Sequence, residues 1–315
     1  MSFGIDDESG RLGIFSDSSD DSSDDSSDDS SDDDYVLING VLVKVRGDGS
    51  VDDDSADGTN DDDDIQGSIF SETLRGLFGD DVIRGRLGGD DLFGNEGDDD
   101  INGGGGADDL DGGSGDDDLY GGLGDDNIYG REGSDDMFGD DGDDSLLGGA
   151  GGDNAHGGLG DDRVIGGLGS DNLYGDESDD VLIGGAGRDY LHGGVGSDEL
   201  RGGFGSNTFV GSRDGSADIL ILKSDQFLVN PGTGTSGNNA DGQRTDIITD
   251  LDQSDRVQIE GVTTASLTFQ QTTVTIQGVS YSGIGIFSGG VLEAVYTGDD
   301  LGIQGISAIT SGILG

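Results

Sequence analysis

Residues 121–129 read Gly-Gly-Leu-Gly-Asp-Asp-Asn-Ile-Tyr, and they form one of fifteen consecutive nine-residue lines between Gly76 and Val210. Position 1 is Gly in all fifteen lines, and position 4 is Gly in fourteen. Position 6 is Asp in fourteen lines, and position 8 is apolar in every line. A register kept over so many copies predicts a solenoid, in which each line is a structural unit that packs on its neighbours.

Each conserved column of the repeat has a physical reason. Glycine allows a sharp turn with positive φ, which aims carbonyl oxygens inward beside the position 6 carboxylate. Oxygen ligands in a flexible cage suit Ca2+ better than octahedral Mg2+. Positions 7 to 9 are extended, so position 8 forms a narrow core. The candidate metal ligands are Asp81, Asp90, Asp99, Asp108, Asp117, Asp126, Asp135, Asp144, Asp153, Asp162, Asp171, Asp180, Asp189 and Asp198.

The nine-residue unit resembles the RTX, or haemolysin-type, calcium-binding repeat, Gly-Gly-x-Gly-x-Asp-x-apolar-x. The resemblance covers 76–210, and two degenerate units extend it back to residue 58. It implies an all-β fold, a right-handed parallel β-roll with two lines per turn and Ca2+ between successive turns. One ligand column would then run from Asp81 to Asp189 and the other from Asp90 to Asp198, with roughly a dozen ions in all.

Some lines depart from the pattern. Position 2 is Gly in only nine lines, and Leu77, Arg86 and Arg131 are expected to fit the turn less well there. Ser178 replaces the position 4 glycine, which predicts a weaker calcium site near Asp180. Asn207 carries no charge at position 6 and is expected to end the ladder.

The composition ties folding to a cation. The 315 residues hold 69 acidic and 14 basic residues, for a net charge of −55, and such a chain stays disordered unless something neutralises it. We therefore expect calcium binding and folding to be one event, with an unfolded chain inside the cell and a roll outside. Nucleic acid and anionic membranes are excluded as partners because basic patches are absent. The chain contains no Cys, so disulfides are excluded too.

The residues before the repeats divide into two parts. Residues 1–34 are predicted to be a disordered acidic Ser/Asp tail, for which a solubilising role is favoured over mineral or weak calcium binding. Residues 35–57 are predicted to form a β-hairpin around Asn39-Gly40, followed by an acidic linker. The repeat array then occupies 58–210, of which 58–75 is degenerate.

Residues 211–315 lose the repeat and read as a β-rich cap for the open end of the solenoid. Strands are expected at 218–222, 256–259, 272–276 and 291–296. The way in which the array ends also resembles RTX proteins, and this implies type I secretion through an uncleaved C-terminal segment. That route agrees with an N-terminus that lacks the pattern of a signal peptide. The expected location is extracellular or at the cell surface, without membrane insertion.

The sequence offers no candidate active site. The 75 residues before the array are too few and too acidic for a catalytic domain. His156 and His192 are 36 residues apart, which does not fit a zinc-protease helix, and they are expected about 10 Å apart on one side of the roll as solvated strand residues. Tyr120, Tyr129 and Tyr174 at position 9 are read as surface cover, although a carbohydrate platform is an alternative.

Two functions remain. The first is a secreted or cell-surface, non-enzymatic calcium-binding protein that acts in structural assembly, a surface layer, a matrix or adhesion. The alternative is an accessory polysaccharide-binding module for a polymer-modifying enzyme. The first is preferred, and the expected partners are calcium and either the protein itself or an extracellular polysaccharide.

Overall fold

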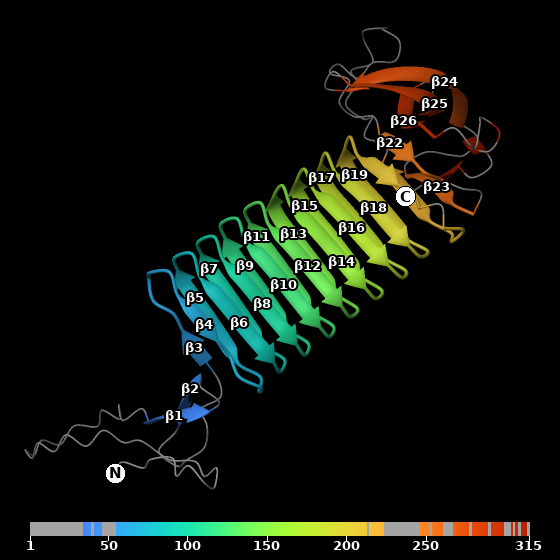
Figure 1. Cartoon of the computed structure of the whole chain (residues 1–315). Coiled ribbons are helices and arrows are strands. Elements are labelled where there is room, and N and C mark those ends of the chain that lie inside the picture. The colour runs from blue at the N-terminus through green and yellow to red at the C-terminus, as the bar shows by residue number, and fades with distance from the viewer. Residues whose placement is uncertain are drawn as a thin grey trace, which may run out of the picture.

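The computed structural model describes residues 34–38, 41–45, 55–212, 214–223, 246–251, 254–260, 267–276, 279–288, 291–298, 304, 306–307 and 310–313. The fold is all-β, and it is built on two long sheets that run side by side through the repeat array (Figure 1). One sheet has 12 strands and the other has 13. The predicted parallel β-roll is confirmed.

Successive lines of the repeat contribute strands to the two sheets in turn. The 12-stranded sheet contains β3 Ser55–Asp57, β5 Thr73–Phe78, β7 Asp91–Glu96, β9 Asp109–Ser114, β11 Asn127–Glu132, β13 Ser145–Gly151, β15 Arg163–Gly169, β17 Val181–Gly187, β19 Glu199–Gly205, β21 Ile219–Lys223, β23 Arg256–Glu260 and β27 Thr310–Ile313. The 13-stranded sheet contains β4 Asp64–Gln66, β6 Val82–Leu87, β8 Asp100–Gly105, β10 Asp118–Leu123, β12 Asp136–Asp141, β14 Asn154–Leu159, β16 Asn172–Glu177, β18 Tyr190–Val195, β20 Thr208–Val210, β22 Asp246–Thr249, β24 Leu267–Ile276, β25 Val279–Ser288 and β26 Val291–Tyr296.

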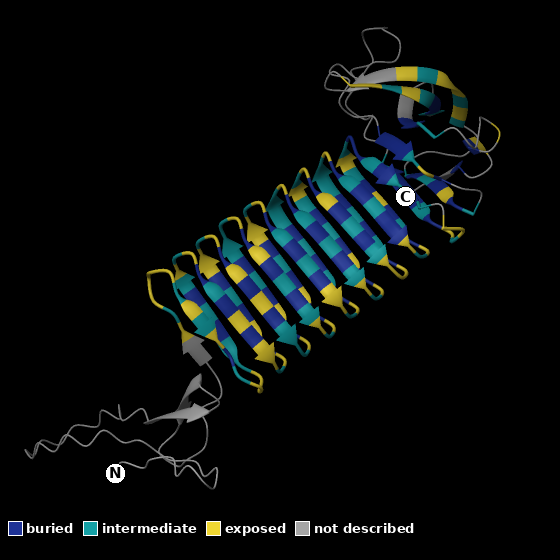
Figure 2. Ribbon diagram, viewed as in Figure 1, coloured by how far each residue is buried: buried dark blue, intermediate teal, exposed yellow. Residues whose placement is uncertain are grey.

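The strand register fixes two lines per turn. Leu119 of β10 pairs with Met137 of β12, and Ile128 of β11 pairs with Leu146 of β13, so partners within a sheet are 18 residues apart. Side chains alternate between the inside and the outside, as the stripes of Figure 2 show. Position 8 is buried throughout the array and forms one continuous core column between the sheets.

The hairpin segment lies before the roll. β1 Asp34–Ile38 and β2 Val41–Val45 pair antiparallel, with Ile38 opposite Val41. This is the pairing that the Asn-Gly dipeptide predicts. The acidic tail expected over 1–34 lies outside the described residues, apart from its last residue at the start of β1.

The sheets do not stop at the last repeat. β19 pairs in parallel with β21, β21 with β23, and β23 with β27. On the other sheet β20 pairs with β22 and β22 with β26, and β24, β25 and β26 then follow as antiparallel neighbours. The strands expected beyond residue 210 are present, but the first of them continue the solenoid instead of covering its end. In the described part of the chain, no helix has the length and apolar character needed to cross a membrane.

Glycine is favoured at position 4 by the close approach of successive turns, and Ser178 is the exception among the fifteen lines. A Cβ built on Gly124 would lie 1.7 Å from the carbonyl oxygen of Gly106 in the preceding turn. Position 2 instead tolerates side chains in the left-handed region: Leu77, Arg86 and Arg131 adopt φ between 83° and 85°. The poor fit expected for these three residues therefore appears as backbone strain, without loss of the strand register.

The exposed Ser178 gives a direct test of this strain. It occupies position 4 with φ 89°, so Ser178→Gly should raise the free energy of unfolding by about 0.5–1 kcal/mol as the left-handed cost is removed. The measurement is denaturant unfolding in saturating Ca2+. Ser170→Gly at position 5, where φ is not positive, is the matched control and should be neutral or slightly destabilising. Equal effects of the two changes would contradict the strain argument.

Candidate functional site: two columns of buried carboxylates

The turns on each edge of the roll stack their position 6 aspartates into a column. The backbone N–H of each aspartate donates to Oδ1 of the aspartate one turn further along, as Asp108 does to Asp126 at 2.7 Å and Asp126 to Asp144 at 2.7 Å. Across the repeats these bonds measure 2.7–3.2 Å. One column runs from Asp81 to Asp189 and the other from Asp90 to Asp198, in the two series that the sequence predicts.

The second oxygen of each carboxylate has no partner. All fourteen aspartates are at most 2% exposed, yet in every one of them Oδ2 is buried without a hydrogen bond. A buried polar atom normally finds a partner, because leaving it unsatisfied costs about 1–3 kcal/mol, and more when it carries charge. Fourteen such atoms in two rows therefore mark positions where a cation can bind.

Other oxygens lie beside each unpaired carboxylate oxygen. A Cβ built on Gly85 would be 2.4 Å from Oδ2 of Asp90 and 2.7 Å from the carbonyl oxygen of Gly103, one turn further along. The position 1 glycine therefore leaves open a small space that a carboxylate and a main-chain carbonyl share. No group of three or more His, Cys, Asp or Glu side chains in the described chain is arranged to hold a metal ion.

Burial raises the pKa of these carboxyls above the ordinary value of 3.8. Desolvation is the largest cause, the hydrogen bond from the preceding turn opposes it, and in most cases neighbouring carboxylates raise the pKa further. The pKa becomes about 6 for Asp99, Asp135, Asp144 and Asp198, about 7 for Asp90, Asp117, Asp126, Asp153, Asp162 and Asp189, and about 8 for Asp180. It is also raised for Asp81, Asp108 and Asp171.

This donor set fits calcium. The oxygens are hard ligands, the turn supplies them from a flexible main chain, and the unpaired carboxylate oxygen calls for a cation. The degenerate units differ in this respect. Asp63 accepts hydrogen bonds from Thr59 N at 2.6 Å and Thr59 Oγ1 at 2.9 Å, and Glu72 is bound by Ser68. Their carboxylates are already satisfied by neighbours, so the unpaired columns begin at Asp81 and Asp90.

Two irregular lines keep the hydrogen bonds of the column. The geometry at Asp180 matches that of the other lines, because Ser178 adopts the conformation of the glycine that it replaces. Asn207 continues the hydrogen bonds of the column, since its Oδ1 accepts from Asp189 N at 3.0 Å and its own N–H donates to Asp246 Oδ1 at 2.8 Å, but the row of unpaired carboxylate oxygens on this edge ends before it. Hydrogen bonding along the column needs only an oxygen acceptor, which an amide supplies as well as a carboxylate.

Sequence reasoning missed Asp218. Its Oδ1 accepts from Asp198 N at 3.1 Å, its Oδ2 is buried and unpaired, and burial raises its pKa to about 7. Two extra residues separate it from the nine-residue frame, so counting lines did not find it. The sequence does contain a signal for this residue: Asp218 directly precedes the β-prone run Ile219-Leu220-Ile221, so the four residues resemble positions 6 to 9 of a repeat line.

A second row of aspartates at position 5 was also missed. Oδ1 of Asp80 accepts from the N–H of Asp98, and Oδ1 of Asp98 from the N–H of Asp116. On the other edge Oδ1 of Asp125 accepts from the N–H of Asp143 in the same way. These side chains are exposed and point away from the core, so they add charge and hydrogen bonds to the rims of the turns without forming a buried oxygen site.

The position 9 aromatics of the 13-stranded sheet stack on one another. Ring centroids are 5.1 Å apart for Tyr120 and Phe138, 5.4 Å for Phe138 and His156, and 4.3 Å for His156 and Tyr174, with ring planes within 9°. His192 pairs with Tyr174 on the next strand, so the two histidines share one side as predicted. His156 is not simply solvated, because it stacks on both neighbours and its Nδ1 lies 2.9 Å from Asp176 Oδ2.

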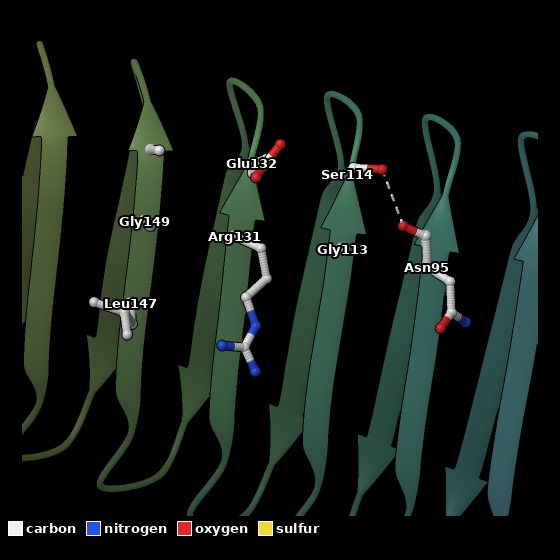
Figure 3. Close-up of a pocket in the computed structure, with 9 residues that line it drawn as sticks. Asn95, Gly113, Ser114, Arg131, Glu132, Leu147 and Gly149 are labelled. Atoms are coloured by element: carbon white, nitrogen blue, oxygen red, sulfur yellow. Dashed lines mark hydrogen bonds between the residues drawn. The ribbon is translucent and has the colours of Figure 1, made fainter.

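A shallow groove lies on the 12-stranded sheet (Figure 3). It measures about 550 Å3, and its lining includes Arg131, Glu132 and Leu147 along with several glycines. The guanidinium of Arg131 is held at 2.6 Å by Asp111 and lies over the ring of Tyr129. Its charge is thus already matched within the sheet, and the groove presents no unpaired cation to a ligand.

Comparison with known families identifies the repeats. The model of the RTX calcium-binding nonapeptide repeat (4 copies) matches at 66–101, 85–119, 102–137, 111–146, 138–173, 147–182 and 174–209. None of the curated proteins matches the chain. The matched residues contain all fourteen aspartates with an unpaired Oδ2 in the repeats, while Asp218 lies beyond them.

The raised pKa values predict how pH controls the metal-free roll. A folded carboxyl with a raised pKa binds protons more tightly than the unfolded chain, so its stabilisation is complete below pH 4 and disappears as the pH rises through 6 to 8. In EDTA we expect β-structure near pH 4 and its loss by pH 8. Far-ultraviolet circular dichroism, with light scattering to detect aggregation, measures this. Undiminished β-structure at pH 8 in EDTA would contradict the prediction.

Proposed function

Because residues 66–209 are RTX calcium-binding nonapeptide repeats, we propose that this chain is a secreted, non-enzymatic protein that folds on Ca2+ and then assembles with copies of itself. The observation that carries the proposal is the pair of columns of buried carboxylate oxygens without partners. In this assignment the fourteen position 6 aspartates, from Asp81 to Asp198, are calcium ligands, and carbonyl oxygens of the neighbouring turns complete each site. Roughly a dozen ions fill the gaps between them.

Because folding is coupled to calcium, the calcium concentration decides whether the chain is unfolded or folded. Extracellular calcium modules bind with dissociation constants of about 10⁻⁴–10⁻³ M, far above the level of free calcium in the cytosol. The chain stays unfolded where it is made, which suits export by type I secretion, and it folds after release. RTX repeats are typical of secreted proteins, and the location proposed here is extracellular or at the cell surface.

The outer face of the 12-stranded sheet supports assembly. Over β13, β15, β17 and β19 the outward positions align Leu147 with Ile165 and Ile183, and Ala150 with Leu168, Ala186 and Phe204. Leu168 is 62% exposed and Phe204 is 53% exposed. A contiguous apolar surface of this kind on a soluble protein marks an interaction site. We call these residues the apolar face.

Charge favours a second copy as the occupant of the apolar face. The four strands that carry it have a net charge of +1, whereas β12, β14, β16 and β18 of the other sheet carry −5. Two copies of a chain with a net charge of −55 repel over most of their surfaces. Repulsion between two copies is therefore weaker at the apolar face than over β12, β14, β16 and β18, so two copies can meet there.

The polysaccharide alternative receives less support. Aromatic platforms bind sugars through exposed ring faces, but Tyr120, Phe138, His156 and Tyr174 cover those faces by stacking on one another. The groove on the other sheet holds an arginine that is already paired with Asp111. The structural role is therefore the stronger proposal.

Removal of one ligand should weaken the loaded roll. Asp144→Asn takes a carboxylate out of the column and should lower the free energy of unfolding in saturating Ca2+ by about 1–3 kcal/mol. The adjacent Asp143→Asn changes the charge equally, but at an exposed position 5 residue, and should stay within about 0.5 kcal/mol. Calcium titration followed by circular dichroism, with Mg2+ as the control ion, measures both. A cooperative transition shifted equally by the two variants would argue against Asp144 as a ligand.

Assembly through the apolar face has its own matched pair. Leu168→Glu places a charge on the apolar face and should convert the calcium-loaded assembly to monomers, because a charge buried in an interface is costly. Leu159→Glu makes the same change at an exposed leucine on the 13-stranded sheet and should leave assembly intact. Sedimentation velocity with Ca2+ and with EDTA measures the outcome. A wild-type chain that is monomeric in Ca2+ at all concentrations would contradict the proposal.

A further inference from the structure

We propose that the chain holds a further cation site outside the repeats, beside Asp218 in the segment that follows the array. The site rests on the proposed function, because it would take the same ion, Ca2+. It lies past residue 209, where the matched repeats end. Its role would be to fasten the first non-repeat strands to the roll.

The hydrogen-bond ladder passes through this point without interruption. Asp198 N donates to Asp218 Oδ1 at 3.1 Å, and Asp218 N donates to Asp255 Oδ1 at 3.2 Å. The main-chain bonds of the repeat also continue, since Ile219 N donates to the carbonyl oxygen of Asp198 at 2.7 Å and Arg256 N to that of Asp218 at 2.7 Å. Asp218 thus occupies a true position 6, although it is 20 residues after its neighbour instead of 18.

The oxygens around Asp218 reproduce those of a repeat turn. Its side chain is 1% exposed, and its Oδ2 is buried without a hydrogen-bond partner. Gly211 stands where a position 1 glycine would stand: a Cβ built on it would be 3.3 Å from Asp218 Oδ2 and 3.6 Å from the carbonyl oxygen of Asp250, with Cδ2 of Leu251 at 3.0 Å, so this space is wider than that around Gly85 and has one apolar neighbour. A carboxylate oxygen and a main-chain oxygen of the next turn therefore border the same open space, as they do around Gly85.

The opposite edge of the roll ends differently. There Asn207 occupies position 6, and its Nδ2 is buried without a partner in the place where the aspartates carry Oδ2. A Cβ built on Gly202 would lie 2.5 Å from this nitrogen. An amide N–H group directed into the space opposes a cation, so this edge should lose its last site while the edge with Asp218 gains one.

Strand pairing shows what the added ion would hold. Asp218 immediately precedes β21, which pairs with β19 of the array on one side and with β23 on the other. An ion beside Asp218 Oδ2 and the carbonyl oxygen of Asp250 therefore links the turn between β20 and β21 to the turn between β22 and β23. Loss of this ion should loosen β21 and β23 while the middle of the array remains intact.

The test compares Asp218→Asn with Asn207→Asp in the full-length protein. Asn207 shows that the ladder accepts an amide at position 6, so Asp218→Asn should fold. Bound calcium is counted by equilibrium dialysis and elemental analysis, and circular dichroism verifies folding. We expect one ion fewer than wild type in Asp218→Asn and one more in Asn207→Asp. Hydrogen exchange in Ca2+ should show faster amide exchange for 219–223 and 256–260 in Asp218→Asn, with 118–165 unchanged.

Failure of this site can be told apart from failure of the proposed function. A wild-type protein that binds no calcium would overturn both. A wild-type protein that binds calcium, with an unchanged ion count in Asp218→Asn, would overturn the site alone. An unchanged count in Asn207→Asp would overturn the claim that the amide costs the other edge an ion.

Discussion

Repulsion between stacked carboxylates is the constraint that governs this roll. Each turn buries a carboxylate oxygen with no donor to meet it, and the next turn of the same column adds another at the strand spacing. Two like charges about 4.8 Å apart repel by about 3.5 kcal/mol at an effective dielectric constant near 20. A divalent cation between them turns that repulsion into attraction. We therefore expect folding and ion binding to be two parts of one equilibrium, with protonation of the carboxylates as the metal-free way to reduce their repulsion.

The stacking of identical positions in successive turns also explains which positions of the repeat accept residues other than glycine. Position 4 faces the same position of the preceding turn so closely that a Cβ would overlap a carbonyl oxygen, as at Gly124. At position 2 a Cβ would also approach a carbonyl oxygen of the preceding turn, at 2.3 Å on Gly104, but Leu77 and Arg86 show that this position accepts side chains with a positive φ at the cost of strain. The core is one apolar side chain per line, as in the column through Ile128, and offers little hydrophobic stabilisation to set against the charge.

The nine-residue register was enough to predict the core and the repeated position 6 aspartates, whereas the two lines per turn and the two columns were implied by the resemblance to the RTX repeat. Local residue identity was a poorer guide. The lines of Asp180 and Asn207 depart from the repeat in sequence, yet both keep the hydrogen bonds of the column, because the turns on either side impose their conformation. Asp218 was missed because an insertion of two residues shifts it out of the nine-residue register, although the strand that follows it still pairs with β19. The aromatic row from Tyr120 to Tyr174 becomes visible only when alternate lines are assigned to one sheet.

The apolar face and the proposed ion sites lie in different parts of the roll, so calcium would control assembly through folding and not through direct contact with the interface. The carboxylate columns lie inside the turns at the edges of the roll, whereas Leu147, Ile165 and Ile183 lie on the outside of a sheet. These three residues are 18 apart along the chain and align only when the turns stack. Calcium therefore need not bridge two copies. In the proposed function, folding on calcium creates this face, whose four strands carry no net negative charge, and removal of calcium would remove the interface by unfolding the strands that form it.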